Sequence, residues 1–502
     1  MNSPTSPRTV PALLASAAAR APEHPAVDDG QTALSMGELA ARVAGTATLL
    51  AETGIGRGDR VALWLPNSVE FVESFLGVLA CGAAALPLAA AARPAEVRRI
   101  LGETPVQALV APPDALRTLV LPGVSPLASG PRGLDIAAAP RTQRDALLSR
   151  RTPPPPEPAD AALVAYSSGT LARPHVVVRT HENLWWEAEN FWSATRLGPD
   201  DVVLGVVPLS HAHGLGNALL ASLRAGARLV LRPRFLRRQT LDLLARERVT
   251  VFPTVPFMVR MLAATDGRRS WDVAALRLCF SAGAALAPET YAAFRARFGV
   301  PVRQLYGLTE AGSVALNNAP AAEIDPASAG TPLGSVRVTI EDPQGREVPR
   351  SEIGEIVVRS PAAAGGAERA LRTRDQGRWS AHGELLITGR TSLFINTAGN
   401  KVDPAEVEAA LRLHPAVADV AVFALPAAHG EQVVAAAVVR RAPCTADALR
   451  LHCRTLLASY KVPRVVSFRT ALPRSPLGKV LIGQLLTSMS PGSPQLRHHC
   501  ST

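Results

Sequence analysis

The sequence has few lysines and no run of five or six like charges. Of its 53 basic residues only three are Lys, at Lys401, Lys461 and Lys479, and the Arg residues are spread along the chain. The net charge of +11 therefore reflects an Arg-rich composition rather than one concentrated basic patch. Aromatic residues make up 4% and do not interleave with basic ones, so we expect no nucleic-acid partner.

The sequence also lacks a CxxC pair, a metal-ligand spacing and an apolar signal segment within its first ten residues. Five irregularly spaced Cys indicate a reducing, cytoplasmic setting. The uncharged run 75–92 is long enough to raise the question of a membrane span. It is rich in Ala and Gly and contains Pro87, so we interpret it as a buried helix leading into a strand and expect no membrane span.

The chain length and the pattern of apolar and helix-length segments predict an α/β protein of more than one domain. Short apolar runs alternate with helix-length segments, as at 60–65 and 68–80, which predicts parallel strands with crossover helices. The segments 336–341 and 354–359 predict instead a hairpin in a β-rich subdomain, and the last hundred residues predict a small α+β domain. The predicted boundaries are a large N-terminal domain at 1–389, a hinge at 390–392, a C-terminal domain at 393–488 and a tail at 489–502.

The sharpest local motif is Ala-Tyr-Ser-Ser-Gly-Thr at 165–170, directly after a strand-like run. Three hydroxyls and a Gly on a tight loop offer several donors to one anion, as a phosphate cradle requires. The same composition is common in ordinary turns, so this motif alone leaves both interpretations open.

Further motifs follow in order along the chain. Residues 304–310 place an aromatic ring, a hydroxyl and a carboxylate within five positions after a strand, and Asp375 lies in Thr-Arg-Asp. The Pro/Gly turn at 473–479 ends in Lys479. Together these motifs resemble the adenylate-forming superfamily of acyl- and aryl-CoA synthetases, peptide-synthetase adenylation domains and luciferases. Further matching segments, which extend the resemblance over nearly the whole chain, are 66–71, 208–215, 281–286 and 399–408.

The resemblance implies an enzyme that binds ATP, Mg²⁺ and a small-molecule acid. The carboxylate attacks the α-phosphate, pyrophosphate leaves, and the acyl-adenylate then passes its acyl group to a thiol of CoA or a carrier-protein phosphopantetheine. By position, Thr309 is expected at the α-phosphate, Glu310 as the Mg²⁺ ligand and Tyr306 on the adenine. The remaining residues expected to bind ATP or AMP are Ser167, Ser168, Gly169, Thr170, Gly307, Asp375 for the ribose hydroxyls, and Arg390.

Lys479 is expected to be the catalytic cation of the first half-reaction, carried by a mobile small domain. Gly399 and Lys401 are expected to face the site in the second half-reaction, whereas Lys461 is assigned only a structural place. His211 is expected as a catalytic residue bordering the acid pocket, with a satisfied core His as the alternative. The residues expected to line that pocket are His213, Phe257, Ser281, Ala282, Gly283 and Gly312.

Several positions depart from the pattern of the family. The phosphate loop has Ala172 and His175 where the family has Gly and Lys, so pyrophosphate is expected to rely more on Mg²⁺, Arg173 and Arg179. Arg374 replaces the Gly of Thr-Gly-Asp, and the hinge position is Ser392.

Three interpretations stay open: an acyl-CoA or carrier-protein ligase, an enzyme that activates an unusual acid such as nitrite for transfer to an amine, as in some diazo-forming relatives, and a non-catalytic nucleotide-binding homologue.

Overall fold

The computed structural model describes residues 7–119, 121–130, 133–135, 154–167, 175–266, 269–390, 395–427, 431–473, 480 and 482–489. These residues form two compact units: a large one with most of the chain up to Arg390, and a small one with the segment 91–99 and the residues from Ile395 onward. The predicted fold class, a large α/β domain followed by a small α+β domain, is confirmed. The hinge 390–392 stays a prediction, because 391–394 lie outside the described residues.

A nine-stranded sheet organises the large unit, in the order β16-β15-β14-β13-β12-β10-β11-β1-β2. The strands from β14 to β1 in this order are parallel to their neighbours, and β2, β15 and β16 are antiparallel. Their bounds are β1 Pro25–Asp28, β2 Ala33–Ser35, β10 Val202–Gly205, β11 Arg228–Leu231, β12 Val251–Thr254, β13 Leu278–Ser281, β14 Val302–Leu308, β15 Gly312–Leu316 and β16 Thr331–Pro332.

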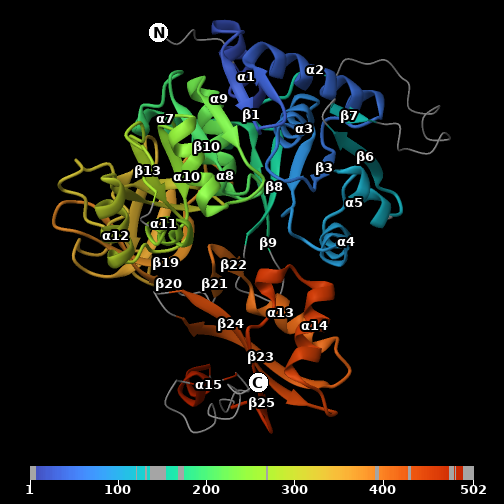
Figure 1. The fold of residues 1–502 in the computed structure, drawn as a ribbon, viewed down its shortest axis with the longest axis vertical. Helices are drawn as coiled ribbons and strands as arrows, with labels where there is room; N and C mark the ends of the chain where they lie inside the picture. Colours follow the sequence, from blue (N-terminus) through green and yellow to red (C-terminus); the bar gives the residue numbers. More distant parts are fainter. Residues whose placement is uncertain are drawn as a thin grey trace. The chain divides into compact units, whose positions relative to one another are not determined.

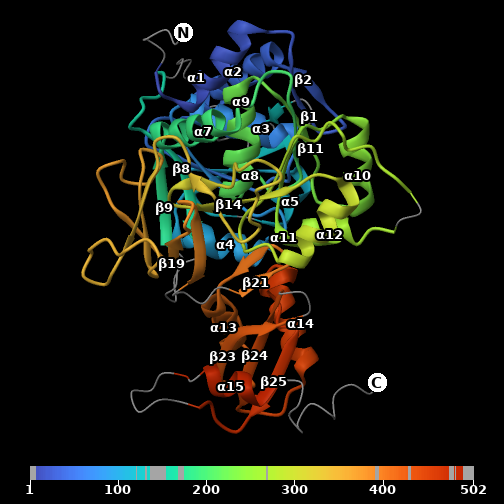
Figure 2. The same cartoon turned by 90° about the vertical axis from the view of Figure 1, so that its left-hand side faces the viewer.

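The described helical segments between residues 181 and 298 include a π-helix. Their bounds are α7 His181–Thr195, α8 Ala212–Gly214, the π-helix η2 Leu215–Leu220, α9 Ala221–Ala225, α10 Arg237–Arg246, α11 Pro256–Ala263 and α12 Pro288–Phe298. Figure 2 shows α10, α11 and α12 grouped beside one another. The sequence predicts a helix at 216–225, and the structure forms η2 and α9 there, but the π geometry has no simple sequence signal.

A second, seven-stranded sheet has the order β7-β6-β5-β3-β4-β8-β9. Its strands are β3 Arg60–Leu63, β4 Ala84–Pro87, β5 Ala108–Ala111, β6 Ser125–Gly130, β7 Gly133–Asp135, β8 Ala161–Ser167 and β9 His175–Thr180. The accompanying helices are α1 Val10–Arg20, α2 Met36–Glu52, α3 Val69–Ala80, α4 Pro94–Glu103 and α5 Pro113–Thr118.

The uncharged run 75–92 forms the end of α3 and then β4, as predicted. Figure 1 shows α1, α2 and α3 side by side. The helices α2 and α3 approach so closely that a Cβ at Gly77 would overlap Thr46. Within the described residues, no helix is long and apolar enough to cross a membrane.

An antiparallel sheet of β17 Arg337–Glu341, β18 Gly354–Arg359, β19 Leu371–Trp379 and β20 Leu385–Arg390 completes the large unit. Its first two strands confirm the predicted hairpin. The register pairs Asp375 of β19 with Arg390 of β20.

The small unit is built on the sheet β23-β24-β25, whose two faces carry separate apolar clusters. Residues on one face pack against α13 and α14, and those on the other pack against α15 (Figure 2). The bounds are β21 Ile395–Thr397, β22 Asn400–Val402, α13 Pro404–Arg412, β23 Val417–Pro426, β24 Gln432–Arg440, α14 Ala446–Leu456, the 3-10 helix η4 Ser459–Lys461, β25 Val465–Arg469 and α15 Ile482–Met489.

Lys461 has the structural place that the sequence suggested. It ends η4, its side chain is buried, and its Nζ lies 3.0 Å from a carboxylate oxygen of Glu406 on α13. Burial alone would lower the pKa of Lys461, but the surrounding carboxylates, Glu406 first, raise it above the ordinary value. The charged Lys461 side chain therefore links η4 to α13 within the small unit.

Asp403, which caps α13, generates a stability prediction. Its carboxylate accepts the N–H of Ala405 at 2.8 Å, and burial, together with Glu406 and Glu408, raises its pKa to about 6. Because the folded state then binds a proton more tightly than the unfolded state, stability falls as the pH rises from about 4 to 6. Asp403→Asn keeps the capping acceptor without the charge and should stabilise the protein by about 1–2 kcal/mol at pH 7.5.

The measurement is the thermal midpoint of the variant and of the parent at pH 7.5 and at pH 4. The difference between the two proteins should disappear at pH 4. Asp447→Asn is the control, because Asp447 is a well-exposed carboxylate in the first turn of α14 and should leave the midpoint nearly unchanged. Equal effects of Asp403→Asn at both pH values would contradict the assigned titration.

Candidate active site

The carboxyl ends of four neighbouring parallel strands bring the predicted segments to one edge of the nine-stranded sheet. β10, β12, β13 and β14 are adjacent, and they end at Gly205, Thr254, Ser281 and Leu308. The segments 206–215, 255–257, 282–286 and 309–312 follow directly. In open parallel sheets this edge is where ligands bind, so the topology supports a site here.

The hairpin of β14 and β15 carries Thr309 and Glu310 in its turn. A Cβ at Gly307 would come within 2.7 Å of the Gly312 carbonyl oxygen, so only Gly fits this close approach. The backbone carbonyl of Glu310 accepts the N–H of Ala364 at 2.7 Å. Neither the Thr309 hydroxyl nor the Glu310 carboxylate has a hydrogen-bond or ion-pair partner among the described residues, and both are half-buried. Both groups are thus available to a ligand.

Tyr306 joins this hairpin to the antiparallel sheet. Its hydroxyl donates to Oδ2 of Asp375 at 2.6 Å, and Asp375 is 5% exposed. The Asp375 N–H donates to the Thr373 hydroxyl at 3.1 Å, and that hydroxyl donates to the Ile356 carbonyl at 2.7 Å. Two residues predicted to bind adenosine therefore form one hydrogen-bonded pair between β14 and β19.

Arg374 occupies a position that favours Gly. Its φ is 62°, in the left-handed region, and its N–H donates to Oε1 of Glu355 at 2.9 Å. This conformation explains why the related motif has Gly between Thr and Asp. Arg374 nevertheless adopts this conformation within β19, where the pairing with β18 shifts register.

His213 belongs to a polar network that includes two residues the sequence did not single out. Its Nε2 lies 2.9 Å from the Thr254 carbonyl oxygen, and its Nδ1 lies 3.0 Å from the amide of Asn217 on η2. The Ser313 hydroxyl donates to Asn217 Oδ1 at 2.7 Å. Burial lowers the pKa of His213 to about 4, so the ring is neutral near pH 7 and both nitrogens are occupied.

The other predicted pocket residues lie around the same strand ends. Phe257, on α11, packs edge-on against Phe235 at 6.3 Å between ring centroids. Ser281 is buried and its hydroxyl has no hydrogen-bond partner among the described residues. Ala282 is also buried, and no atom lies within 4 Å of the place where a Cβ at Gly283 would stand. His211, just before α8, is exposed.

The predicted phosphate loop begins where β8 ends, at Ser167. The preceding Tyr166 hydroxyl lies 2.5 Å from the Thr104 hydroxyl and 3.2 Å from the Ile100 carbonyl oxygen. Ser168, Gly169, Thr170 and Lys479 lie outside the described residues, so their roles stay predictions.

The expectation that Arg179 neutralises pyrophosphate is wrong. Its side chain is 1% exposed, and Nη1 lies 2.6 Å from Oε2 of Glu187, which is 2% exposed. A guanidinium that is buried and paired in this way cannot also face a solvent-delivered anion. One signal in the sequence pointed to this pair, because Glu187 lies at helical spacing among Leu184, Ala188 and Phe191 of α7, which are buried.

Gly399 and Lys401 lie in the small unit on the hairpin of β21 and β22. Thr397 pairs with Asn400, and the two residues between them, Ala398 and Gly399, have φ of 48° and 80°. Positive φ at both central positions is the requirement of a tight two-residue hairpin. Lys401 pairs with Asn396 across the ladder.

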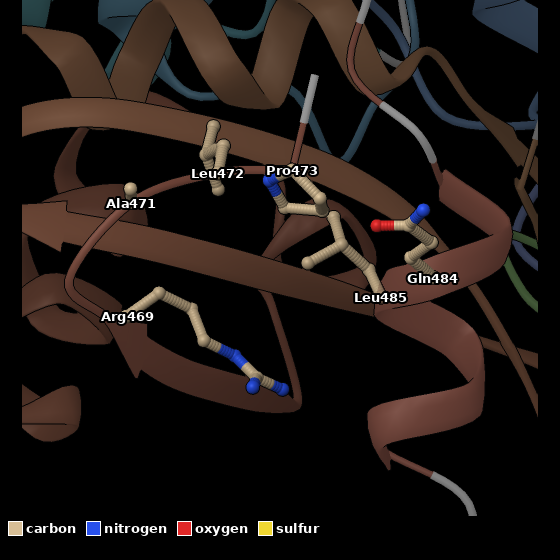
Figure 3. Close-up of a pocket in the computed structure, with 6 residues that line it drawn as sticks. All are labelled: Arg469, Ala471, Leu472, Pro473, Gln484 and Leu485. Carbon is tan, nitrogen blue, oxygen red and sulfur yellow. The ribbon is translucent and has the colours of Figure 1, made fainter. Parts of the chain in front are cut away.

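A pocket of about 330 Å³ lies elsewhere in the small unit (Figure 3). Arg469, at the end of β25, and two residues of α15, Gln484 and Leu485, border it. Ala471, Leu472 and Pro473 complete the lining. Of the described residues that line this pocket, none is a predicted site residue, although Pro473 is the first residue of the turn 473–479.

Comparison with known proteins decides the family. The profile of the AMP-binding enzyme family matches residues 14–366, and that of the AMP-binding enzyme C-terminal domain matches residues 406–479. The chain belongs to the AMP-binding enzyme family.

Curated relatives of this AMP-binding enzyme are CoA ligases. A sulfoacetate–CoA ligase of Cupriavidus necator is 34% identical, covering 96% of this chain and 98% of the relative. A feruloyl-CoA synthase of an Amycolatopsis species is 32% identical, covering 92% and 96%. Among solved structures, the amide bond synthetase McbA from Marinactinospora thermotolerans matches with a TM-score of 0.82 and 28% identity, covering 96% of this chain and 99% of that one. The prediction of an AMP-forming acid ligase of the adenylate-forming superfamily is confirmed.

The Tyr306–Asp375 hydrogen bond generates a prediction for the AMP-binding enzyme. Tyr306→Phe removes the donor that orients Asp375 and should weaken AMP binding by about three- to tenfold, the scale of one ordinary hydrogen bond. Isothermal titration with AMP measures this effect. Tyr291→Phe removes the hydroxyl of a buried Tyr on α12 of the large unit and should leave AMP affinity unchanged. Equal affinities of Tyr306→Phe and the parent would refute the orienting role.

Proposed function

We propose that the chain activates a small carboxylic acid with ATP and transfers the acyl group to the thiol of CoA. One observation carries the proposal: Tyr306 lies on the same hairpin as Thr309 and Glu310, whose hydroxyl and carboxylate have no protein partner among the described residues, and it donates a hydrogen bond to Asp375 on β19. An aromatic ring and a fixed carboxylate suit a nucleoside, and the two available groups suit its phosphates and their cation.

The nucleotide would contact both residues of the Tyr306–Asp375 pair. Tyr306 stacks on the adenine, and Asp375, held at Oδ2, offers its carboxylate to the ribose hydroxyls. Thr309 contacts the α-phosphate, and Arg390, whose position in the ladder is opposite Asp375, approaches the sugar and phosphate. The phosphate loop supplies the remaining donors from Ser167, Ser168, Gly169 and Thr170.

Mg²⁺ fits the residues that are present. No group of three or more His, Cys, Asp or Glu that could hold a metal occurs within the described ranges, whereas Glu310 is one available carboxylate beside the proposed phosphate position. Mg²⁺ is commonly held by one or two carboxylates together with substrate phosphates, so Glu310 would hold it with ATP. When bound, the ion neutralises the phosphate charge that would otherwise repel the acid.

In the first half-reaction an acid oxygen bonds to the α-phosphorus while the bond to pyrophosphate breaks. Lys479 bridges the attacking carboxylate and the α-phosphate and so offsets their repulsion, and His211 borders the reacting acid. In the second half-reaction the thiol sulfur bonds to the acyl carbon, AMP leaves, and the thiol proton goes to solvent. Gly399 and Lys401 guide the incoming thiol.

The acid pocket supports a short or aryl acid that carries a polar group. Phe257, Gly283 and Gly312 offer apolar or open surface, whereas the buried Ser281 hydroxyl lacks a protein partner and His213 is tied into a polar network. A buried hydroxyl without a partner is costly unless a ligand engages it. Both sulfoacetate and ferulate, the acids named for two relatives, carry polar groups beyond the carboxylate.

An amine acceptor is the second candidate, and the likeness to an amide bond synthetase favours it. Transfer to an amine, with a carboxylic acid or nitrite as the activated acid, would use the same first half-reaction; a carrier-protein thiol is a further acceptor. The non-catalytic alternative is disfavoured because Thr309, Glu310 and Asp375 keep the arrangement that adenylation needs.

An exchange assay separates these functions. We expect ATP–pyrophosphate exchange with carboxylic acids, tested with fatty, aryl, dicarboxylic and sulfonated acids and with nitrite. Product analysis with CoA or with a primary amine then identifies the acceptor. Exchange with nitrite alone, or product only with the amine, would replace the CoA proposal with the second candidate. Absence of exchange with every acid despite measurable ATP binding would refute both.

Two of the three lysines offer a matched pair of variants. Lys479→Ala should slow adenylation by about 10²–10³-fold, the scale of removing one transition-state charge partner. Lys401→Ala should leave exchange within about threefold of the parent and slow only thioester formation. Near-normal exchange in Lys479→Ala would contradict its assignment, and equal slowing of both steps in Lys401→Ala would contradict the division of roles.

A further inference from the structure

A buried ion pair lies beneath the turn that carries Thr309 and Glu310. Arg179 is on β9, the strand that follows the phosphate loop, and Glu187 is on α7. Their side chains are 1% and 2% exposed, and Arg179 Nη1 lies 2.6 Å from Glu187 Oε2. Neither group faces solvent or a ligand directly, so any effect on the reaction must act through neighbouring backbone.

The carboxylate of Glu187 is in close contact with two glycines at the site. A Cβ at Gly312, the first residue of β15, would overlap this carboxylate, and so would a Cβ at Gly216 in η2. Gly312 also has a φ of 68°, which only Gly adopts without strain. Glu187 therefore packs against Gly312, the residue that directly follows the turn 309–311.

The guanidinium of Arg179 holds a second segment that touches the same turn. Nη2 donates to the Ala362 carbonyl oxygen at 2.8 Å and to the Asn183 carbonyl oxygen at 3.3 Å. The Asn183 amide donates to the Pro361 carbonyl oxygen at 2.8 Å. Two residues after Ala362, the N–H of Ala364 donates to the Glu310 carbonyl oxygen at 2.7 Å. A continuous set of contacts thus runs from Arg179 to the backbone of Glu310.

The energetics do not favour a purely stabilising role. Removing two charges from water costs several kcal/mol, and apolar residues of similar volume often stabilise a protein as well as a buried pair does. In addition, the Arg179 Nε is buried without a hydrogen-bond partner among the described residues. Apolar residues could not donate the hydrogen bond that Arg179 makes to the Ala362 carbonyl oxygen, and they would not place a carboxylate against Gly312.

We infer that Arg179 and Glu187 are positioning residues that hold the Thr309–Glu310 turn in the orientation needed to bind the Mg²⁺-bound phosphates of ATP. The inference rests on the proposed function, since it assigns to Glu310 the cation of the nucleotide. It distinguishes two parts of the site: Tyr306 and Asp375, which bind adenosine and are braced independently through Thr373, and the turn, which depends on the buried pair.

The test compares AMP affinity with the Mg²⁺-dependent gain in ATP affinity, which is the ratio of ATP affinity in saturating Mg²⁺ to ATP affinity in EDTA. The double variant Arg179→Met/Glu187→Leu removes both charges, so it leaves no unpaired buried ion. Isothermal titration measures AMP without metal, and ATP in EDTA or in saturating Mg²⁺. We expect the Mg²⁺-dependent gain in ATP affinity to fall about tenfold, the scale of one lost hydrogen bond to a charged group, while AMP affinity changes less than about twofold.

Asp201→Asn is the matched control. Asp201 forms an ion pair with Arg277 at 2.6 Å and precedes β10, at the amino ends of the strands and away from the site edge. This variant should lower the thermal midpoint and leave the Mg²⁺-dependent gain unchanged. Should the double variant fail to fold, Glu187→Gln, which keeps an acceptor for Arg179, is measured instead and should lower the gain about threefold.

The outcomes separate this inference from the proposed function. A parent-like Mg²⁺-dependent gain in the folded double variant overturns the positioning role and leaves the proposed function intact. Equal losses of AMP and Mg²⁺-ATP affinity also overturn it, because they indicate a general distortion. A parent protein that binds neither AMP nor ATP overturns the proposed function and the inference together.

Discussion

The parallel pairing of β10, β12, β13 and β14 is the constraint on which the site depends. Neighbouring parallel strands must end at the same edge of the sheet, so four segments from distant parts of the sequence are delivered to one place. The antiparallel return of β15 then turns Thr309 and Glu310 toward the same edge. Without this pairing the motifs would be isolated turns of no particular chemistry.

Charge is the second organising requirement, because adenylation brings a carboxylate and a polyphosphate together. The polar groups of the large unit differ in whether they already have protein partners. Thr309 and Glu310 are available, Asp375 is held by Tyr306, and Arg179 is fully committed to Glu187. At least one of the many Arg residues, Arg179, therefore holds other segments in place inside the large unit instead of facing a ligand.

Prediction from the sequence succeeded where a local pattern has one structural solution. The uncharged run 75–92 is predicted to be a buried helix leading into a strand, and Gly82, with a φ of 86°, lies between the end of α3 and the start of β4. The hairpin around 342–353 and the α/β alternation followed in the same way. Prediction failed at Arg179, because an Arg near a phosphate loop and an Arg inside a core look alike in sequence; only the position of Glu187 on an apolar helix face hinted at the difference.

The sequence by itself determined the family, the order of its motifs and the residue types of the proposed nucleotide site, since these depend on chemistry carried by short segments. Only the tertiary structure decided which polar groups are available and which are already satisfied. The hydrogen bond from Tyr306 to Asp375 and the pairing of Arg179 with Glu187 join residues on different elements. Such contacts depend on how strands and helices pack in three dimensions, and no local spacing in the chain records them.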